Sequence, residues 1–143
     1  MTSAEAARVH EFRDSSQDHH TPEAKAQAGF KFFLKVADLW GLSGEERCNL
    51  LGLSAKSTYH HWQKNGITRP SMDLIDRLSY ILGIHESVME AFPDDHGGVQ
   101  WLRRPNRSRL LEGEAPLGRM LRGHMNDLRV VRDYLDGAAE VWS

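Results

Sequence analysis

The chain has 143 residues, of which 40% are apolar and 27% are charged, and its formal net charge is −2. These values are typical of a globular protein with one domain or two small ones. No apolar run approaches the ~20 residues that a membrane-spanning helix needs, and the first residues lack a signal-peptide core, so the sequence predicts a cytoplasmic protein. The single cysteine, Cys48, excludes an internal disulfide bond, and its position predicts a small buried side chain.

Residues 1–21 are rich in alanine, serine, acidic residues and histidine and show little apolar periodicity. This composition predicts a mobile N-terminal tail. His10, His19 and His20 form no i, i+4 pair and have no cysteine beside them, so no metal site is predicted there.

Two predicted helices follow the tail. The first begins at Pro22, with Thr21 as its N-cap, and runs to about Trp40. Ser43 and Glu46 stand at capping-box spacing and start the second helix. Apolar residues at spacings of three and four predict which face of the first helix is buried: Phe30, Phe33, Leu34, Ala37 and either Leu39 or Trp40.

A glycine turn is predicted after the second helix. Gly52 tolerates the positive φ that such a turn often needs, and Leu53 is an apolar plug that ties the turn to the core. Ser54 is placed to cap the next helix through its hydroxyl group. Thr58 and Trp62 follow Ser54 at helical spacing, so we expect both side chains to point inward.

The outer face of this next helix is polar and cationic. No acidic residue occurs between Glu46 and Asp73, which is the charge distribution that phosphate neutralisation requires. The pattern is that of a helix-turn-helix, whose second helix suits a DNA major groove; the alternative is an ordinary corner between two helices with a solvated face. We predict base contacts for the first three of the following residues and phosphate contacts for the last two: Lys56, Ser57, His60, Lys64 and Arg69.

A further helix is predicted to begin after its cap Ser71 and to end at Gly83, and residues 85–92 are predicted to form a short helix. This gives about five helices in the first part of the chain. Their order, the sequence Leu51-Gly52-Leu53-Ser54 and Trp62 resemble the Xre-type helix-turn-helix domain, which binds DNA. The residues predicted to face inward are Leu74, Ile75, Leu78, Ile81 and Leu82.

Residues 93–98 interrupt the helices, and arginine replaces lysine entirely after this break. Arginine is favoured at protein interfaces but is also an ordinary surface residue. Pro105 stops a helix that contains Trp101, Pro116 starts a short one, and a final helix begins at about Met125. Its apolar stripe consists of Leu128, Val131, Leu135, Ala138 and Trp142.

The pattern Trp101-Leu102-x-x-Pro105-Asn106, then Gly113-x-x-Pro116-Leu117, then an amphipathic helix resembles the toxin-binding domain of the Xre/MbcA/ParS antitoxins. The loop at residues 107–112 is a residue or two longer than the usual pattern. The resemblance implies a type II antitoxin of the RES–Xre type. Such a protein neutralises a cognate toxin, most often a RES-domain toxin that consumes NAD, and represses its own operon by binding operator DNA as a dimer.

Together these patterns predict an all-α protein. Residues 1–21 form the tail, residues 22–92 an Xre-like helix-turn-helix bundle, and residues 94–143 a small helical toxin-binding domain. Trp101, Pro105 and Asn106 are expected to serve packing and a turn. The predicted toxin-contacting residues are Arg129, Arg132, Asp136, Glu140, Val141, Trp142 and Ser143.

The apolar stripe of the final helix continues through Val141 and Trp142, where chain ends are usually polar and frayed. A terminal tryptophan is a typical interface anchor, so we expect this segment to reach or enter the toxin's active site. The alternative is that Trp142 folds back onto Trp101 or Leu128 and completes the domain.

No catalytic constellation is visible, because the sequence has no phosphate-binding glycine loop and no nucleophile elbow, and its carboxylates are scattered. We therefore expect a protein that is not an enzyme and has no cofactor. One alternative function is a phage-type or one-component transcriptional repressor whose C-terminal half dimerises or senses a ligand. A structural adaptor without DNA binding is a third class, which the acid-free window disfavours.

Overall fold

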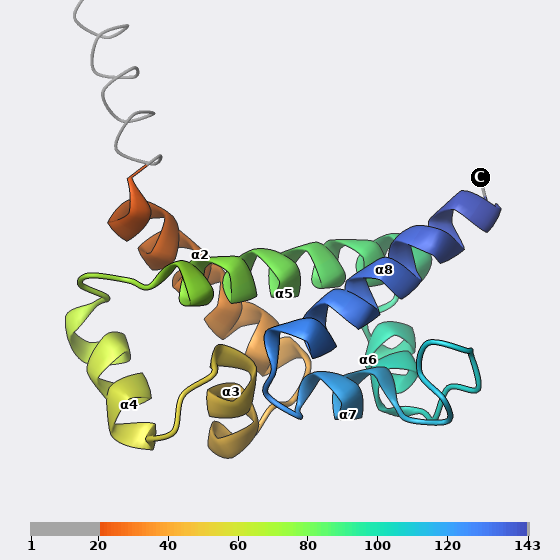
Figure 1. Cartoon of the computed structure of the whole chain (residues 1–143), viewed down its shortest axis with the longest axis horizontal. Coiled ribbons are helices and arrows are strands. Elements are labelled where there is room, and N and C mark those ends of the chain that lie inside the picture. The colour runs from red at the N-terminus through yellow and green to blue at the C-terminus, as the bar shows by residue number, and fades with distance from the viewer. Residues whose placement is uncertain (1–20, 143) are drawn as a thin grey trace, which may run out of the picture.

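The protein is all-α. The computed structural model describes residues 21–142, apart from the side chains of Asp95 and of residues 138–142, and these residues form seven helices and no strand (Figure 1). Residues 1–20 of the predicted tail (residues 1–21) and Ser143 lie outside the described residues. The helices are α2 (Pro22–Leu39), α3 (Gly44–Leu51), α4 (Lys56–Asn65), α5 (Met72–Ala91), α6 (Asp95–Arg103), α7 (Pro116–Met120) and α8 (Met125–Trp142).

The predicted helix starts of α2, α3 and α5 are confirmed. The Thr21 hydroxyl accepts a hydrogen bond from the Ala24 amide, and Ser71 caps α5 in the same way. Ser43 and Glu46 form both halves of a capping box, with distances of 3.1 and 2.9 Å. These signals use residues close in sequence, so local spacing alone places the helix starts.

The turn between α3 and α4 has the expected glycine but not the expected cap. Gly52 has φ +71°, which confirms its left-handed conformation. The prediction that Ser54 caps α4 is wrong: Ala55 occupies the N-cap, and no side chain bonds to the free amides there. Tyr59 is the buried residue of α4, whereas Thr58 and Trp62 are half-buried. The inward face is therefore centred on Tyr59, because α3 and α2 supply its ring and hydroxyl contacts.

Helix α5 is longer than predicted. Gly83 does not end it, and the predicted short helix at residues 85–92 is the last part of the same helix. Arg132 of α8 packs over Gly83, and a Cβ at this position would displace the end of the Arg132 side chain. Four helices, rather than about five, are therefore formed within residues 22–92.

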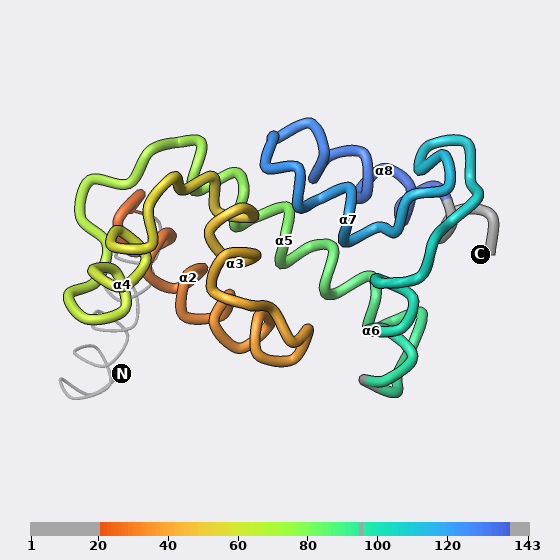
Figure 2. The backbone as a smooth tube through the Cα atoms, turned by 90° about the horizontal axis from the view of Figure 1, so that it is seen from below, coloured from red at the N-terminus to blue at the C-terminus, as the bar shows by residue number. Residues whose placement is uncertain are grey.

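A single core runs through both parts of the chain, and α5 lies at its centre. The first half of α5 packs against α2, and α8 crosses its second half (Figure 1). Figure 2 shows α4 at one end of the molecule and the loop between α6 and α7 at the other. The buried apolar residues, from Ala26 to Leu135, form one continuous cluster.

The break predicted at residues 93–98 is shorter than expected, because α6 already begins at Asp95, where the Asp94 carboxylate caps it by accepting a hydrogen bond from the His96 amide at 3.2 Å. The other C-terminal elements begin and end near the predicted prolines. α6 ends at Arg103, shortly before Pro105; α7 begins at Pro116, and α8 begins at Met125. The Asn106 amide donates to the Glu114 carbonyl at 3.2 Å, and the Gly113 amide donates to the Asn106 carbonyl at 2.8 Å. These bonds close the loop so that Leu111 is buried and Leu110 is 46% exposed. No helix among the described residues is long and apolar enough to cross a membrane.

Candidate functional site

The predicted DNA-contacting side chains are all exposed. Lys56, Ser57, His60 and Lys64 are exposed on α4, and Arg69 is exposed in the connector that follows it. Lys56, Lys64 and Arg69 form no ion pair with any other residue in the range 21–142. The outer face of α4 therefore presents free positive charge, which could neutralise phosphates.

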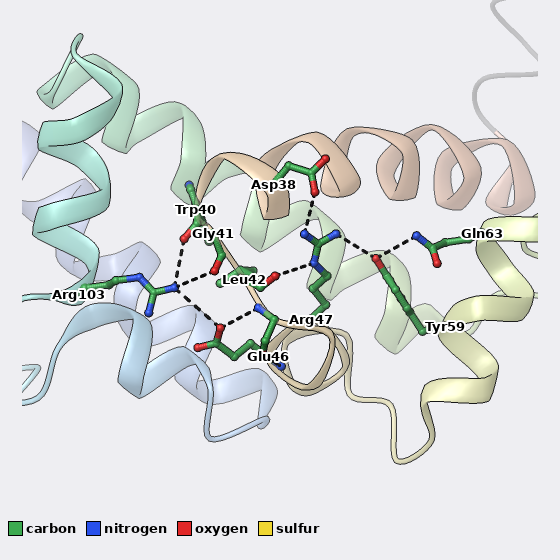
Figure 3. A network of polar contacts seen from close by, with 10 residues as sticks. Asp38, Trp40, Gly41, Leu42, Glu46, Arg47, Tyr59, Gln63 and Arg103 are labelled. Atoms are coloured by element: carbon green, nitrogen blue, oxygen red, sulfur yellow. Dashed lines mark hydrogen bonds and ion pairs between the residues drawn. The ribbon is translucent and has the colours of Figure 1, made fainter.

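A polar network fixes how α4 lies against the rest of the molecule (Figure 3). Arg47 of α3 donates to the Tyr59 hydroxyl at 3.2 Å and to an Asp38 carboxylate oxygen at 2.7 Å. Its Nε donates to the Leu42 carbonyl at 3.0 Å, and Gln63 donates to the same tyrosine hydroxyl at 3.3 Å. Burial lowers the pKa of Arg47, but the bonds to Tyr59 and Asp38 raise it and the net shift is upward, so the guanidinium stays charged. The network thus ties α4 to α2 and α3.

The aromatic side chains of α4 complete this attachment. The ring centroid of Phe30 lies 5.9 Å from that of Tyr59 and 5.8 Å from that of Trp62, both in edge-to-face geometry. Such pairs add to the stabilisation that burial provides. One face of α4 is therefore held against α2, and its polar face stays free.

Arg77 fixes the turn that precedes α4. It is only 7% exposed, and its Nη1 donates to the Leu50 carbonyl at the end of α3 at 3.4 Å. Its Nε pairs with Asp73 at 2.7 Å. The guanidinium lies against Gly52, where a Cβ would approach Cζ to 2.7 Å. A glycine is thus needed here both for its positive φ and for this close approach.

The C-terminal half has its own aromatic stack and buried ion pair. The Trp101 ring stacks on Tyr134 of α8 at 6.0 Å and lies 6.1 Å from Phe92. Asp127 is 4% exposed and accepts a 2.7 Å hydrogen bond from Arg119 Nε, which joins α7 to α8. Its other oxygen accepts from the His124 amide, which satisfies one of the free amides at the start of α8.

Arg103 joins the two halves. From the end of α6 it donates to the carbonyls of Trp40 and Gly41 at 3.2 and 3.3 Å, and it lies 3.8 Å from Glu46 (Figure 3). The Trp40 and Gly41 carbonyls follow the end of α2 and would otherwise lack a helical partner. Glu46 belongs to the capping box of α3, directly before Arg47 in the chain.

Residues 87–140 match the family described as the antitoxin Xre/MbcA/ParS C-terminal toxin-binding domain. This segment is therefore similar to the toxin-binding domain of that antitoxin family. The matched segment begins within α5 and includes α6, α7 and most of α8. The domain therefore includes the Trp101 stack and the Asp127 ion pair.

A second comparison covers more of the chain. The chain is 37% identical over 113 residues to y4oB, an uncharacterized protein of Sinorhizobium fredii. The match covers 79% of this chain and 85% of that protein, so the two belong to one family.

The predicted toxin-contacting residues of the toxin-binding domain divide into two groups. Arg129 and Asp136 are exposed on α8, but Arg132 is half-buried, packs over Gly83 and lies 3.4 Å from Asp136. Arg132 thus has a packing role within the chain. The remaining predictions fall on side chains outside the described residues: Glu140, Val141, Trp142 and Ser143.

The sequence reasoning missed the residues that position these elements. The sequence patterns assign no positioning role to Arg47, Arg77, Arg103 or Asp127. Asp73 and Arg77 at i, i+4 spacing gave one usable signal, but the partners of the other three lie on different elements. Among the described residues, no group of three or more His, Cys, Asp or Glu side chains could hold a metal ion.

Proposed function

We propose that this protein is the antitoxin of a type II toxin–antitoxin pair, which neutralises its toxin by direct binding. The observation that carries the proposal is the match of residues 87–140 to an antitoxin toxin-binding domain. This family suggests a regulatory protein rather than an enzyme. The resemblance noted from the sequence favours a RES-domain toxin that consumes NAD.

We propose further that residues 22–92 act as a helix-turn-helix unit that binds the operator of the same operon. Support comes from α3, the glycine turn and α4 in helix-turn-helix order, and from the exposed, acid-free face of α4. Lys56, Ser57 and His60 would face base edges, while Lys64 and Arg69 would contact phosphates. The pair of half-sites in an operator would be occupied by a dimer of this chain.

The terminal segment of α8 is proposed to enter or cover the toxin's active site. Support comes from the apolar stripe, which continues to Trp142 in the sequence, and from the α8 backbone, which is helical up to that residue. Trp101 already has Tyr134 and Phe92 beside its ring. These neighbours leave less of the Trp101 surface for Trp142 to cover by folding back.

The test is expression of the neighbouring toxin gene with and without this chain. The toxin alone should stop growth and lower cellular NAD, and this chain should restore both and co-purify with the toxin. A triple alanine variant at Lys56, His60 and Lys64 should still neutralise the toxin but lose operator binding. Operator binding without any toxin partner would instead support the alternative function, a one-component repressor.

A further inference from the structure

An apolar groove lies between α2 and α5, outside both candidate sites. It encloses about 550 Å³, and Phe32 on its wall is 53% exposed. Lys35 Nζ lies 6.0 Å from the centroid of the Phe32 ring, but the ring is still more than half exposed. An exposed aromatic ring that continues into an apolar groove, rather than standing alone, is typical of an interaction surface. The apolar lining consists of Ala28, Gly29, Phe32, Ile75, Leu78 and Leu82.

The geometry of α2 places this groove away from α4. Phe30 and Phe32 are separated by about 200° around the helix. Phe30 is 2% exposed and faces Tyr59 and Trp62 of α4, so Phe32 points to the opposite side of α2. A molecule docked in the groove would therefore leave the outer face of α4 free.

The rim of the groove carries opposite charges on its two helices. Lys25 stands on α2 and Asp76 on α5, both are exposed, and neither forms an ion pair within residues 21–142. A surface with one positive and one negative edge is complementary to a copy of itself turned by a two-fold axis. Electrostatic complementarity of this kind fixes the register of an interface.

We propose that the groove is the dimer interface of this protein, and that its occupant is a second copy of the same chain. Phe32 of each copy is the apolar anchor, and Lys25 of each copy faces Asp76 of the other. This proposal rests on the proposed function, in which a dimer of the chain binds the operator, and it assigns the dimer interface to this groove. Two α4 helices then remain available to the two half-sites of an operator.

The first test measures the oligomeric state of the full chain by sedimentation over a range of concentrations. The wild-type chain should be a dimer, and Phe32→Glu should raise the dimer dissociation constant by about tenfold or more, the loss typical of an interface anchor. Leu110→Glu is the matched control, because Leu110 is also an exposed apolar residue, at 46%, but lies in the loop after α6. That variant should dimerise like the wild type.

A charge exchange gives a second test that does not depend on Phe32. Lys25→Asp alone and Asp76→Lys alone each place like charges across both rim contacts and should weaken the homodimer. An equal mixture of the two variants should form a heterodimer, because every contact then joins opposite charges. An effect within one chain cannot produce this recovery on mixing.

Several results would overturn the proposal. A wild-type chain that is monomeric at tens of micromolar, a Phe32→Glu variant that folds and dimerises normally, or single charge variants that do not recover on mixing would each do so. If Phe32→Glu lost toxin binding while remaining dimeric, the groove would belong to the toxin instead. Toxin co-purification tests the antitoxin function separately, so failure of the dimer proposal leaves that result intact.

Discussion

Replacement of Arg77 by methionine should destabilise the whole chain, although Arg77 forms its ion pair with a solvated carboxylate. Its side chain is 9% exposed, whereas that of Asp73 is 56% exposed. The Asp73 pair itself is therefore worth about 0–1 kcal/mol, as exposed pairs are. The larger loss is the charged donor to the Leu50 carbonyl, because hydrogen bonds to charged groups contribute about 1.5–3 kcal/mol. This bond is long, at 3.4 Å, so the lower half of that range applies.

We expect Arg77→Met to lower the free energy of unfolding by about 2 kcal/mol, or the melting temperature by about 5–8 °C for a chain of this size. Asp73→Asn is the matched control and should cost less than about 1 kcal/mol. Urea unfolding followed by circular dichroism measures both. Equal losses in the two variants would show that the ion pair, rather than the attachment to the turn, is what Arg77 provides. A methionine variant as stable as the wild type would refute the argument altogether.

Four further predictions concern other residues of the two candidate sites and the core. Lys64→Ala should weaken binding to all DNA sequences alike and reduce the salt dependence by about one unit in a fluorescence-anisotropy titration, and an unchanged slope would exclude a phosphate contact. Trp62→Ala should cost about 2 kcal/mol in thermal melts, less than the ~3–5 kcal/mol of a fully buried aromatic, because Trp62 is half-buried. The effect of Gly83→Ala on the free energy of unfolding should be more favourable by about 1 kcal/mol in an Arg132→Ala background than in the wild type. Additive effects of the two substitutions would contradict a contact between Gly83 and Arg132. Deletion of residues 138–143 should leave folding and DNA binding intact but abolish rescue from the toxin; intact rescue would show that this segment is not the inhibitory element.

A feature of the fold could be predicted from the sequence when the residues that form it are close together in the chain, and not when they lie on different helices. The cap at Thr21 and the capping box at Ser43 could be predicted because donor and acceptor are three residues apart. The role of Gly83 could not, because its neighbour Arg132 comes from another helix. Tyr59 was missed for the same reason, since its hydroxyl is held by Arg47 of α3. A glycine within a helical pattern is an ambiguous signal until its packing neighbours are known.

The candidate sites follow the same rule. The exposed face of α4 could be predicted from charge, because a solvent-facing residue needs no specific partner inside the molecule. The contacts that hold α4 in place could not, since Asp38, Arg47 and Gln63 come from three different helices. On α8, the helical spacing of the apolar residues predicts the buried face correctly at Leu128, Val131 and Leu135. The same spacing does not distinguish Arg129, which is exposed, from Arg132, which packs on α5.

The two halves of this chain are not expected to be separable, because both pack on α5. Within eleven residues of this helix, Leu78 lies against Gly29 of α2, Gly83 against Arg132 of α8, and Val88 against Gly98 of α6. A chain that ended after α5 would keep the helix but uncover its second half, including Ile84 and Val88, which are fully buried in the intact protein. Burial of such side chains contributes about 1.5–3 kcal/mol each, and a small domain has only about 5–15 kcal/mol of net stability. DNA binding and toxin binding are therefore best assigned by point variants of the full chain, because the loss of either half removes part of the core that holds the other.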